Sequence, residues 1–411
     1  MWFLDATGGI LKKVKGQSKV LLYSLAMHDK NNKFICPIAE FFSSGHDSQT
    51  ISSFLNLVKD VLEKKMPKNS FQWSPIIVTD FSWALINAAC RTFNNVTIES
   101  YIYWCADILI NQQKWLFYSM STILILCYSH FIKLIAKKIK KIKKFSSKKN
   151  NSKLHKIALY TCAVLQKSSN MQDFSFNLKN AYNIFNTKYN SKQKQNSVKA
   201  LIEKIKIGSV SKDCSFNNIE LDKNKSRNSI YVHNSQHNSL RKISPFKAYF
   251  EKLINQHKKN IFIKNKNKKT EINSYYCPKI FKIFFEYIHL MPLWSGVMID
   301  AWSSMNPSIE DITNRLTNNP VENWFDQVKE SLRLFLPAMP SEYADVVYNI
   351  IDAFFEQHPP IKSFELKNYQ NLDRDATEKW SKNRKSIKRR KGYYNVLKDI
   401  DSFEDSFEGK I

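Results

Sequence analysis

The stretch Pro75-Ile-Ile-Val-Thr-Asp-Phe-Ser-Trp-Ala-Leu-Ile-Asn-Ala-Ala89 places one carboxylate, Asp80, between a strand and a helix. Residues 76–78 are an uninterrupted β-branched run, typical of a strand buried on both faces of a mixed or parallel sheet. Ser82 then offers a helix cap ahead of apolar residues at helical spacing. In open α/β sheets chemistry collects at this edge, so Asp80 is a candidate site residue. The alternative is that Asp80 only helps to start the helix.

Neighbouring segments predict more strands of the same sheet. Strands are expected over residues 2–4, 20–27, 34–42 and 96–101. An amphipathic helix is expected over 49–65, with Asp47 or Ser48 placed to cap it. The predicted order is βββαβαβ, with Asp5 at the end of the first strand and Asp80 at the end of the fourth. This order is more specific than either Asp alone.

The composition favours an anionic partner and a reducing compartment. The 411 residues include 63 Lys and Arg against 36 Asp and Glu, a formal net charge of +27. Such a balance favours nucleic acid or an anionic membrane surface, although AT-rich codons account for part of the excess. The 7 cysteines are odd in number and scattered, which argues against a disulfide scaffold. The N-terminus does not resemble a secretory signal, and its abrupt start at a strand predicts that an upstream portion is missing.

Residues 115–135 form an apolar segment followed by a polybasic run over 137–149. This arrangement resembles a short membrane helix with a basic flank, but its Ser, Thr, Tyr and His residues favour a buried core helix. From about residue 137 to 270 Lys, Asn, Ser and Gln dominate, which indicates a basic insertion or linker. Short helices are expected in it over 153–165, 177–185 and 198–207, whereas a loop is expected over 214–241.

A second sharp motif, Asn319-Pro-Val-Glu-Asn-Trp-Phe-Asp-Gln-Val-Lys329, predicts a helix. Asn319 can be its N-cap, Pro320 fits the first position, and Glu322 falls on the flank of the apolar stripe. The buried stripe is expected to be Val321, Trp324, Phe325, Val328 and Leu332. Asp5, Asp80 and Glu322 are therefore the three candidate acids. Phosphodiester chemistry with two divalent cations needs such a cage of carboxylates, and Mg²⁺ or Mn²⁺ is the usual ion.

The sequence resembles the Mutator-like (MULE-type) DDE transposases of the ribonuclease H-like superfamily. The resemblance rests on Leu4-Asp-Ala-Thr-Gly-Gly-Ile10, the strand ending at Asp80, the Glu322 motif and Met291-Pro-Leu-Trp-Ser-Gly296, and covers roughly 1–135 and 272–335. It implies that Asp5, Asp80 and Glu322 are metal ligands. Cys127-Tyr-Ser-His130 matches a Cys-x-x-His element that relatives carry between the second Asp and the Glu.

Two departures accompany the resemblance. Asp80 and Glu322 are 322 − 80 = 242 residues apart, which implies a large insertion. We also expect the DNA-recognition module ahead of the core to be missing, which argues against autonomous transposition.

Each candidate residue also has a purely structural explanation. Asp5 can be a turn residue, and Glu322 can complete a capping box with Asn319. Cys127 and His130 lack a second Cys/His pair for a zinc site, so the alternative for them is a buried Cys and a hydrogen-bonded His.

The sequence thus predicts an α/β chain with a ribonuclease H-like mixed five-stranded sheet, flanked by helices and interrupted by a large basic, mostly helical or disordered insertion. The expected parts are 1–104 and 272–358 for the core, 105–271 for the insertion and 359–411 for a charged tail. If active, the protein would cut or join DNA strands in the nucleus, with Mg²⁺ or Mn²⁺, no small-molecule cofactor, and a homo-oligomer as a candidate state. The alternatives are an inactive transposase relic or DNA-binding protein and, less favoured, a membrane protein anchored by 115–135.

Overall fold

The computed structural model describes residues 1–12, 18–29, 34–65, 76–118, 120, 122–142, 148–206, 240–264, 271–305, 316–332 and 338–357. The chain divides into two compact units. The first comprises Met1–Cys214 and Asp222–Tyr343, and it holds the sheet and all the candidate residues. Of the second, Ser215–Leu221 and Ala344–Ile411, only residues 344–357 are described, and they continue helix α14 (Pro340–Gln357).

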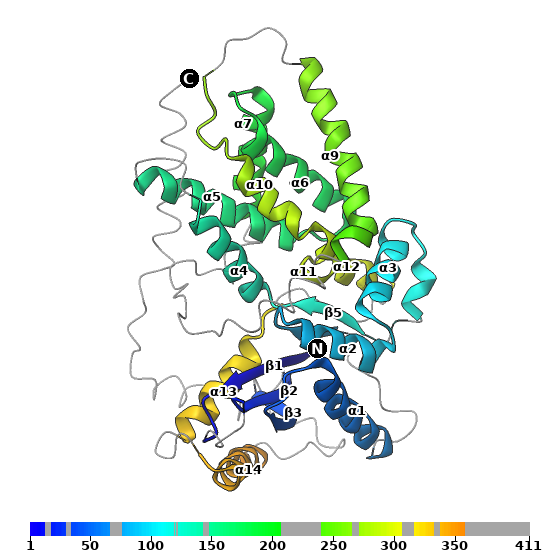
Figure 1. Cartoon of the computed structure of the whole chain (residues 1–411), viewed down its shortest axis with the longest axis vertical. Coiled ribbons are helices and arrows are strands. Elements are labelled where there is room, and N and C mark those ends of the chain that lie inside the picture. Colours follow the sequence, from blue (N-terminus) through cyan, green and yellow to red (C-terminus); the bar gives the residue numbers. More distant parts are fainter. Residues whose placement is uncertain are drawn as a thin grey trace, which may run out of the picture. The chain divides into compact units, whose positions relative to one another are not determined.

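Five strands form one mixed sheet in the order β3-β2-β1-β4-β5 (Figure 1). The strands are β1 (Trp2–Gly8), β2 (Leu21–Asp29), β3 (Phe34–Ser43), β4 (Ile76–Thr79) and β5 (Ile123–Leu126). The pairs β1–β2 and β2–β3 are antiparallel, whereas β1–β4 and β4–β5 are parallel. This is the strand order of a ribonuclease H-like sheet, and the predicted fold class is confirmed.

The register of the parallel strands brings the ends of β4 and β5 level with the middle of β1. Leu4 of β1 pairs with Thr79 of β4, and Thr79 pairs with Leu126 of β5. Every residue of β4 and β5 is buried, as expected for short apolar strands in the centre of a parallel arrangement. Asp80 and Cys127, which follow Thr79 and Leu126 directly, therefore leave the sheet side by side.

Two groups of helices cover the sheet. Helices α1 (Ser48–Lys65) and α2 (Trp83–Asn94) pack against each other, and α2 contacts β5. Helix α13 (Asn319–Ser331) packs against β1, β2 and β3. The predicted stripe of α13 is confirmed, because its members Val321, Trp324, Phe325, Val328 and Leu332 are all buried. The prediction that Asp47 or Ser48 caps α1 is also confirmed, because Asp47 Oδ1 accepts the Thr50 N–H at 2.9 Å.

The prediction of a fifth strand near 96–101 is wrong. Residues 98–109 form helix α3 (Ile98–Leu109), whose first turn is capped by Thr97 through the Ser100 N–H. The buried residues of α3 recur at helical spacing, so packing there outweighs the β-branched start. The fifth strand is β5, inside the segment predicted as a core helix over 115–135. That prediction is also wrong, because the segment divides into the 3₁₀ helix η1 (Lys114–Tyr118), β5 and the start of α4 (Tyr128–Lys140).

The described part of the basic insertion is helical. After α4 come α5 (Lys148–Gln166), α6 (Met171–Asn186), α7 (Lys192–Lys204) and α9 (Pro245–Lys264). The three helices predicted in this region are confirmed and are longer than expected. They are followed by α10 (Pro278–Glu286), the 3₁₀ helix η4 (Ile288–Leu290), α11 (Met291–Trp294) and α12 (Val297–Ser303). Contacts of α10 with α4 and of α11 with β5 tie this helical part to the sheet.

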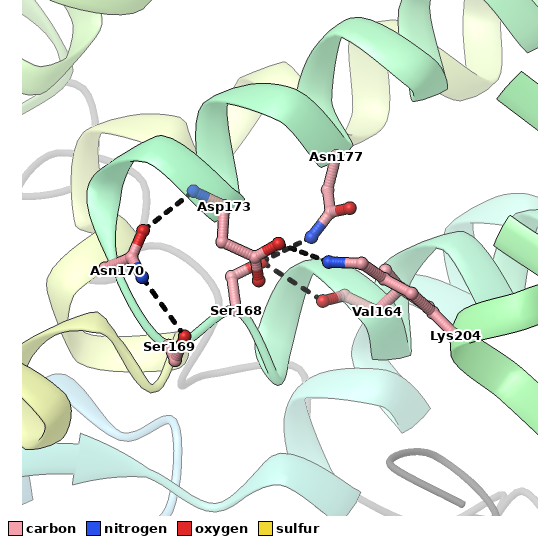
Figure 2. Close-up of polar contacts among 7 residues, drawn as sticks. All are labelled: Val164, Ser168, Ser169, Asn170, Asp173, Asn177 and Lys204. Atoms are coloured by element: carbon pink, nitrogen blue, oxygen red, sulfur yellow. Dashed lines mark hydrogen bonds and ion pairs between the residues drawn. The ribbon is translucent and has the colours of Figure 1, made fainter. Parts of the chain in front are cut away.

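Polar contacts fix the corner between α5 and α6 (Figure 2). Asn170 caps α6 by accepting the Asp173 N–H at 2.9 Å. Asn177 of α6 donates to the Ser168 hydroxyl at 2.9 Å, and Lys204 of α7 pairs with Asp173. These bonds join three successive helices, which gives the insertion a defined structure of its own.

No helix in the described ranges is both long and apolar enough to cross a membrane. Several sequence predictions lie outside the described residues: the loop over 214–239, residues 143–147 of the polybasic run, and the charged tail over 359–411. Residues 240 and 241, the end of the predicted loop, are helical.

Candidate active site

The three candidate acids lie where β1, β4 and α13 meet. Asp80 follows β4, as predicted, and Glu322 lies in the first turn of α13. Asp5 lies in the middle of β1 and not, as the sequence predicted, at its end, because pairing with β2 continues to Gly8. Because Leu4 pairs with Thr79, Asp5 and Asp80 occupy the next positions on two neighbouring parallel strands. Glu322 comes to them from a segment 242 residues further along the chain than Asp80.

Burial and the neighbouring charged groups determine the pKa of Asp5. Burial raises the pKa of Asp5 well above its usual range, and the Asp80 carboxylate raises it further. Glu322 acts in the same direction, whereas His130 and the Ala6 N–H, which donates to Asp5 Oδ1 at 2.7 Å, oppose the shift. A cation bound beside Asp5 would favour the ionised form of this carboxyl.

His130 joins the other two acids. It lies in the first turn of α4, where its Nδ1 contacts Asp80 Oδ1 and its Nε2 lies 3.2 Å from Glu322 Oε1. Burial opposes protonation of this ring, but Asp80 and Cys127 more than offset that effect and raise the pKa of His130 to about 11. The imidazolium therefore holds together carboxylates that follow β4 and begin α13.

Cys127 lies next to Asp80 and His130. It follows β5 directly, it is fully buried, and its Sγ accepts the backbone N–H of Asn318 at 3.2 Å. The Cys127 N–H in turn donates to the Thr79 carbonyl at 2.8 Å, which extends the β4–β5 ladder by one bond. The ligand atoms of Asp80, Cys127 and His130 lie within 4.8 Å of one another.

The sequence predicts Asn319 as the N-cap of α13, which is one residue too late in the chain. Asn318 is the N-cap, the helix begins at Asn319, and the Glu322 N–H bonds to the Asn318 carbonyl at 2.9 Å. The cap makes no side-chain hydrogen bond, so the alternative of a capping box between Asn319 and Glu322 is not realised. The Glu322 side chain contacts His130 instead.

Two further contacts hold α13 in register with the sheet. Glu40 of β3 accepts hydrogen bonds from Trp324 Nε1 at 2.7 Å and from the Tyr343 hydroxyl at 2.6 Å. Burial raises the pKa of Glu40, while these hydrogen bonds lower it. Lys329, seven residues after Glu322, donates to Thr7 Oγ1 at 2.8 Å. These contacts fix how far the first turn of α13 reaches along β1.

The sequence pattern identifies the three acids and the Cys-x-x-His element as candidates, but it does not predict that they lie together in one site. The signal was present, because a strand over 123–126 would have placed Cys127 beside Asp80 and His130 one helical turn beyond. With the fifth strand predicted at 96–101, the contact between His130 and Asp80 could not be predicted. The role of Glu40 had no signal in the sequence, because a charged residue on a strand is ordinarily solvated.

Comparison with known proteins shows a partial similarity to a transposable-element protein. Over 144 residues the chain is 30% identical to the 120.7 kDa protein in the NOF-FB transposable element of Drosophila melanogaster. The similar region makes up 33% of this chain and 12% of that protein, so the chain matches a small part of its relative. No protein-family model matches the chain. No solved structure matches it either.

Proposed function

We propose that the chain derives from a transposable element and that its ribonuclease H-like sheet carries a metal-dependent site for DNA strand cleavage or transfer. The observation that carries the proposal is the grouping of Asp5, Asp80 and Glu322 where β4 ends beside the middle of β1. The partial similarity to a transposable-element protein supports the same function.

The donor set suits Mg²⁺ or Mn²⁺. Asp5, Asp80 and Glu322 offer carboxylate oxygens, the ligands that hard divalent cations prefer. Burial, and after it the Asp80 carboxylate, raises the pKa of Asp5, so a bound cation would stabilise its ionised form. When bound, such ions activate an attacking oxygen and stabilise a leaving oxygen in phosphodiester reactions.

The remaining residues of the site position these acids. His130 orients Asp80 and Glu322 toward each other, while Glu40 and Lys329 hold α13 against the sheet. Basic side chains near this edge would hold the DNA backbone, largely without sequence preference. We also propose that the protein is located in the nucleus and forms homo-oligomers.

The test is a cleavage assay on supercoiled and linear DNA with Mg²⁺ or Mn²⁺. Asp5→Asn, Asp80→Asn and Glu322→Gln are each expected to abolish cleavage, because each removes a carboxylate of the site. Asp326→Asn is the matched control, since Asp326 lies one turn further along α13 and is exposed. Cleavage by the wild type that survives all three substitutions would contradict the proposal.

A second candidate function is DNA binding without turnover. It is favoured by the contacts of His130 with Asp80 and Glu322, which occupy carboxylate atoms that a cation would need. This alternative predicts normal DNA binding and no cleavage, both in the wild type and in Asp80→Asn.

A further inference from the structure

We infer that Asp80, Cys127 and His130 form a binding site for a thiophilic transition-metal ion, with Zn²⁺ as the expected occupant. The site goes beyond the proposed DNA chemistry and does not rest on it, although it shares Asp80 with the carboxylate group.

The geometry comes from two elements that end together. Asp80 follows β4 and Cys127 follows β5 at adjacent positions of the parallel pair, and His130 lies three residues further, in the first turn of α4. Their ligand atoms lie within 4.8 Å of one another. Ligands bound tetrahedrally to one Zn²⁺ ion at about 2.0–2.3 Å lie about 3.3–3.8 Å apart, so side-chain shifts of about 1 Å would suffice.

The donor chemistry selects the type of metal. A thiolate, an imidazole and a carboxylate together suit Zn²⁺, whereas Mg²⁺ prefers oxygen ligands alone. Cys127 is fully buried, but the side chains of Asp80 and His130 are each 22% exposed. Three protein ligands leave the fourth position of a tetrahedral zinc ion for a water molecule or another ligand.

Neighbouring hydrogen-bond partners support the same assignment. With Nδ1 of His130 directed toward Asp80, Nε2 faces Glu322 Oε1 at 3.2 Å. A metal-bound histidine commonly donates its second N–H to a carboxylate in this way. The Asn318 N–H, at the start of α13, donates to Cys127 Sγ, and donors at a helix N-terminus stabilise a thiolate.

The test uses the full chain, freed of metal with a chelator and titrated with Co²⁺. We expect one Co²⁺ per chain, a thiolate-to-cobalt charge-transfer band, and displacement of Co²⁺ by Zn²⁺. Cys127→Ser should remove the band, and His130→Gln should weaken Co²⁺ binding at least tenfold. Glu322→Gln should keep the band and weaken binding about 10–100-fold, the usual effect of removing a carboxylate that orients a metal-bound histidine.

Cys277→Ser is the matched control for Cys127→Ser. Both cysteines are buried N-cap residues, of α10 and α4, and neither makes a side-chain cap hydrogen bond. Serine is a preferred N-cap, so both variants should fold, as far-UV circular dichroism can check. A wild type without the band, or a band that survives in Cys127→Ser, would overturn the inference.

One further variant separates this inference from the proposed function. Asp5 is not one of the three proposed zinc ligands. The Asp5→Asn variant should therefore bind Co²⁺ like the wild type but lose Mn²⁺-dependent cleavage. A wild type that cleaves DNA but gives no cobalt band would refute the zinc site alone.

Discussion

His130 links two acids that lie far apart in the sequence, and its position decides how the candidate site is assembled. The ring contacts Asp80 through Nδ1 and Glu322 through Nε2. A carboxylate that begins a helix has several rotamers, and a fixed hydrogen-bond donor selects one of them. His130 is thus a positioning residue for both carboxylates.

Replacement of His130 by Ala is therefore expected to lower the rate of metal-dependent DNA cleavage by about 10–100-fold, the range found when a residue that orients a metal ligand is removed. DNA affinity should change little, because the substitution leaves the basic surface intact. Single-turnover cleavage rates and a binding titration measure the two effects separately. His155→Ala is the control, since the His155 ring bonds the Ile142 carbonyl at 2.9 Å and lies on α5, outside the candidate site. Equal losses of cleavage in both variants would argue against positioning by His130.

At the scale of single elements, α13 depends on a buried carboxylate for its orientation. Glu40 accepts hydrogen bonds from Trp324 of α13 and from Tyr343 at the start of α14. Because Trp324 is fully buried, loss of its N–H leaves Glu40 with one fewer partner and no access to water on that side.

Trp324→Phe is expected to lower the free energy of unfolding by about 1–3 kcal/mol, the cost of leaving a buried polar group under-satisfied. Urea denaturation measures this loss. In a double-mutant cycle, Trp324→Phe should cost less in a Glu40→Gln background than in the wild type, because the charge that needs the donor is gone. Strictly additive losses would show that packing of the indole, rather than its hydrogen bond to Glu40, accounts for the effect.

The N-terminus of α1 gives the fold a dependence on pH. Asp47 accepts the Thr50 N–H at 2.9 Å and the Thr50 hydroxyl at 2.8 Å. These bonds lower the pKa of Asp47 in the folded chain. Ionised Asp47 therefore stabilises the fold fully above its unfolded pKa of about 3.9, and the contribution is lost as the pH falls through the folded value.

Asp47→Asn is expected to keep most of the stability at pH 7, because Asn is also a good cap, and to remove this part of the acid sensitivity below about pH 4. Asp47→Ala should lose about 1 kcal/mol at pH 7. Chemical denaturation of the three proteins between about pH 7 and about pH 3 tests both statements. A difference between wild type and Asp47→Asn that stays constant with pH would contradict the assignment.

These elements also show how far the fold and the site could be predicted from the sequence. Short β-branched runs and a clear apolar stripe were sufficient for β1, β4 and α13, because local pattern and burial agree there. The run 96–101 has the same local character, yet it begins α3, where the Thr97 cap and packing at helical spacing prevail. The run 123–126 is a strand because β4 needs a parallel partner. That requirement is tertiary, so local pattern could not place His130 beside Asp80.

At the scale of the whole molecule, we ask which of the basic side chains that give the net charge of +27 lie near the candidate site. Helix α4 carries His130 in its first turn and rises about 1.5 Å per residue, so its end lies about 15 Å from the acids. Lys140 and Lys141 are exposed there, and a duplex on the acids would be within their reach. Ser43 of β3 lies level with Gly8 of β1, because both pair with Leu21 of β2. Helix α1 follows Ser43 and runs away from this end of the sheet. Its terminal pair Lys64 and Lys65 is therefore the natural comparison.

We predict that Lys140→Gln/Lys141→Gln weakens DNA binding and reduces the slope of log affinity against log salt concentration by about two, one for each phosphate that the variant no longer neutralises. Lys64→Gln/Lys65→Gln removes the same charge from the end of a helix with the same Lys-Lys sequence, but at the opposite edge of the sheet. It should leave the slope within error of the wild type. Fluorescence anisotropy with a duplex of arbitrary sequence at several salt concentrations measures the slopes. Equal reductions in both variants would mean that DNA responds to net charge alone, and then the edge that carries Asp5, Asp80 and Glu322 would have no preferred role in binding.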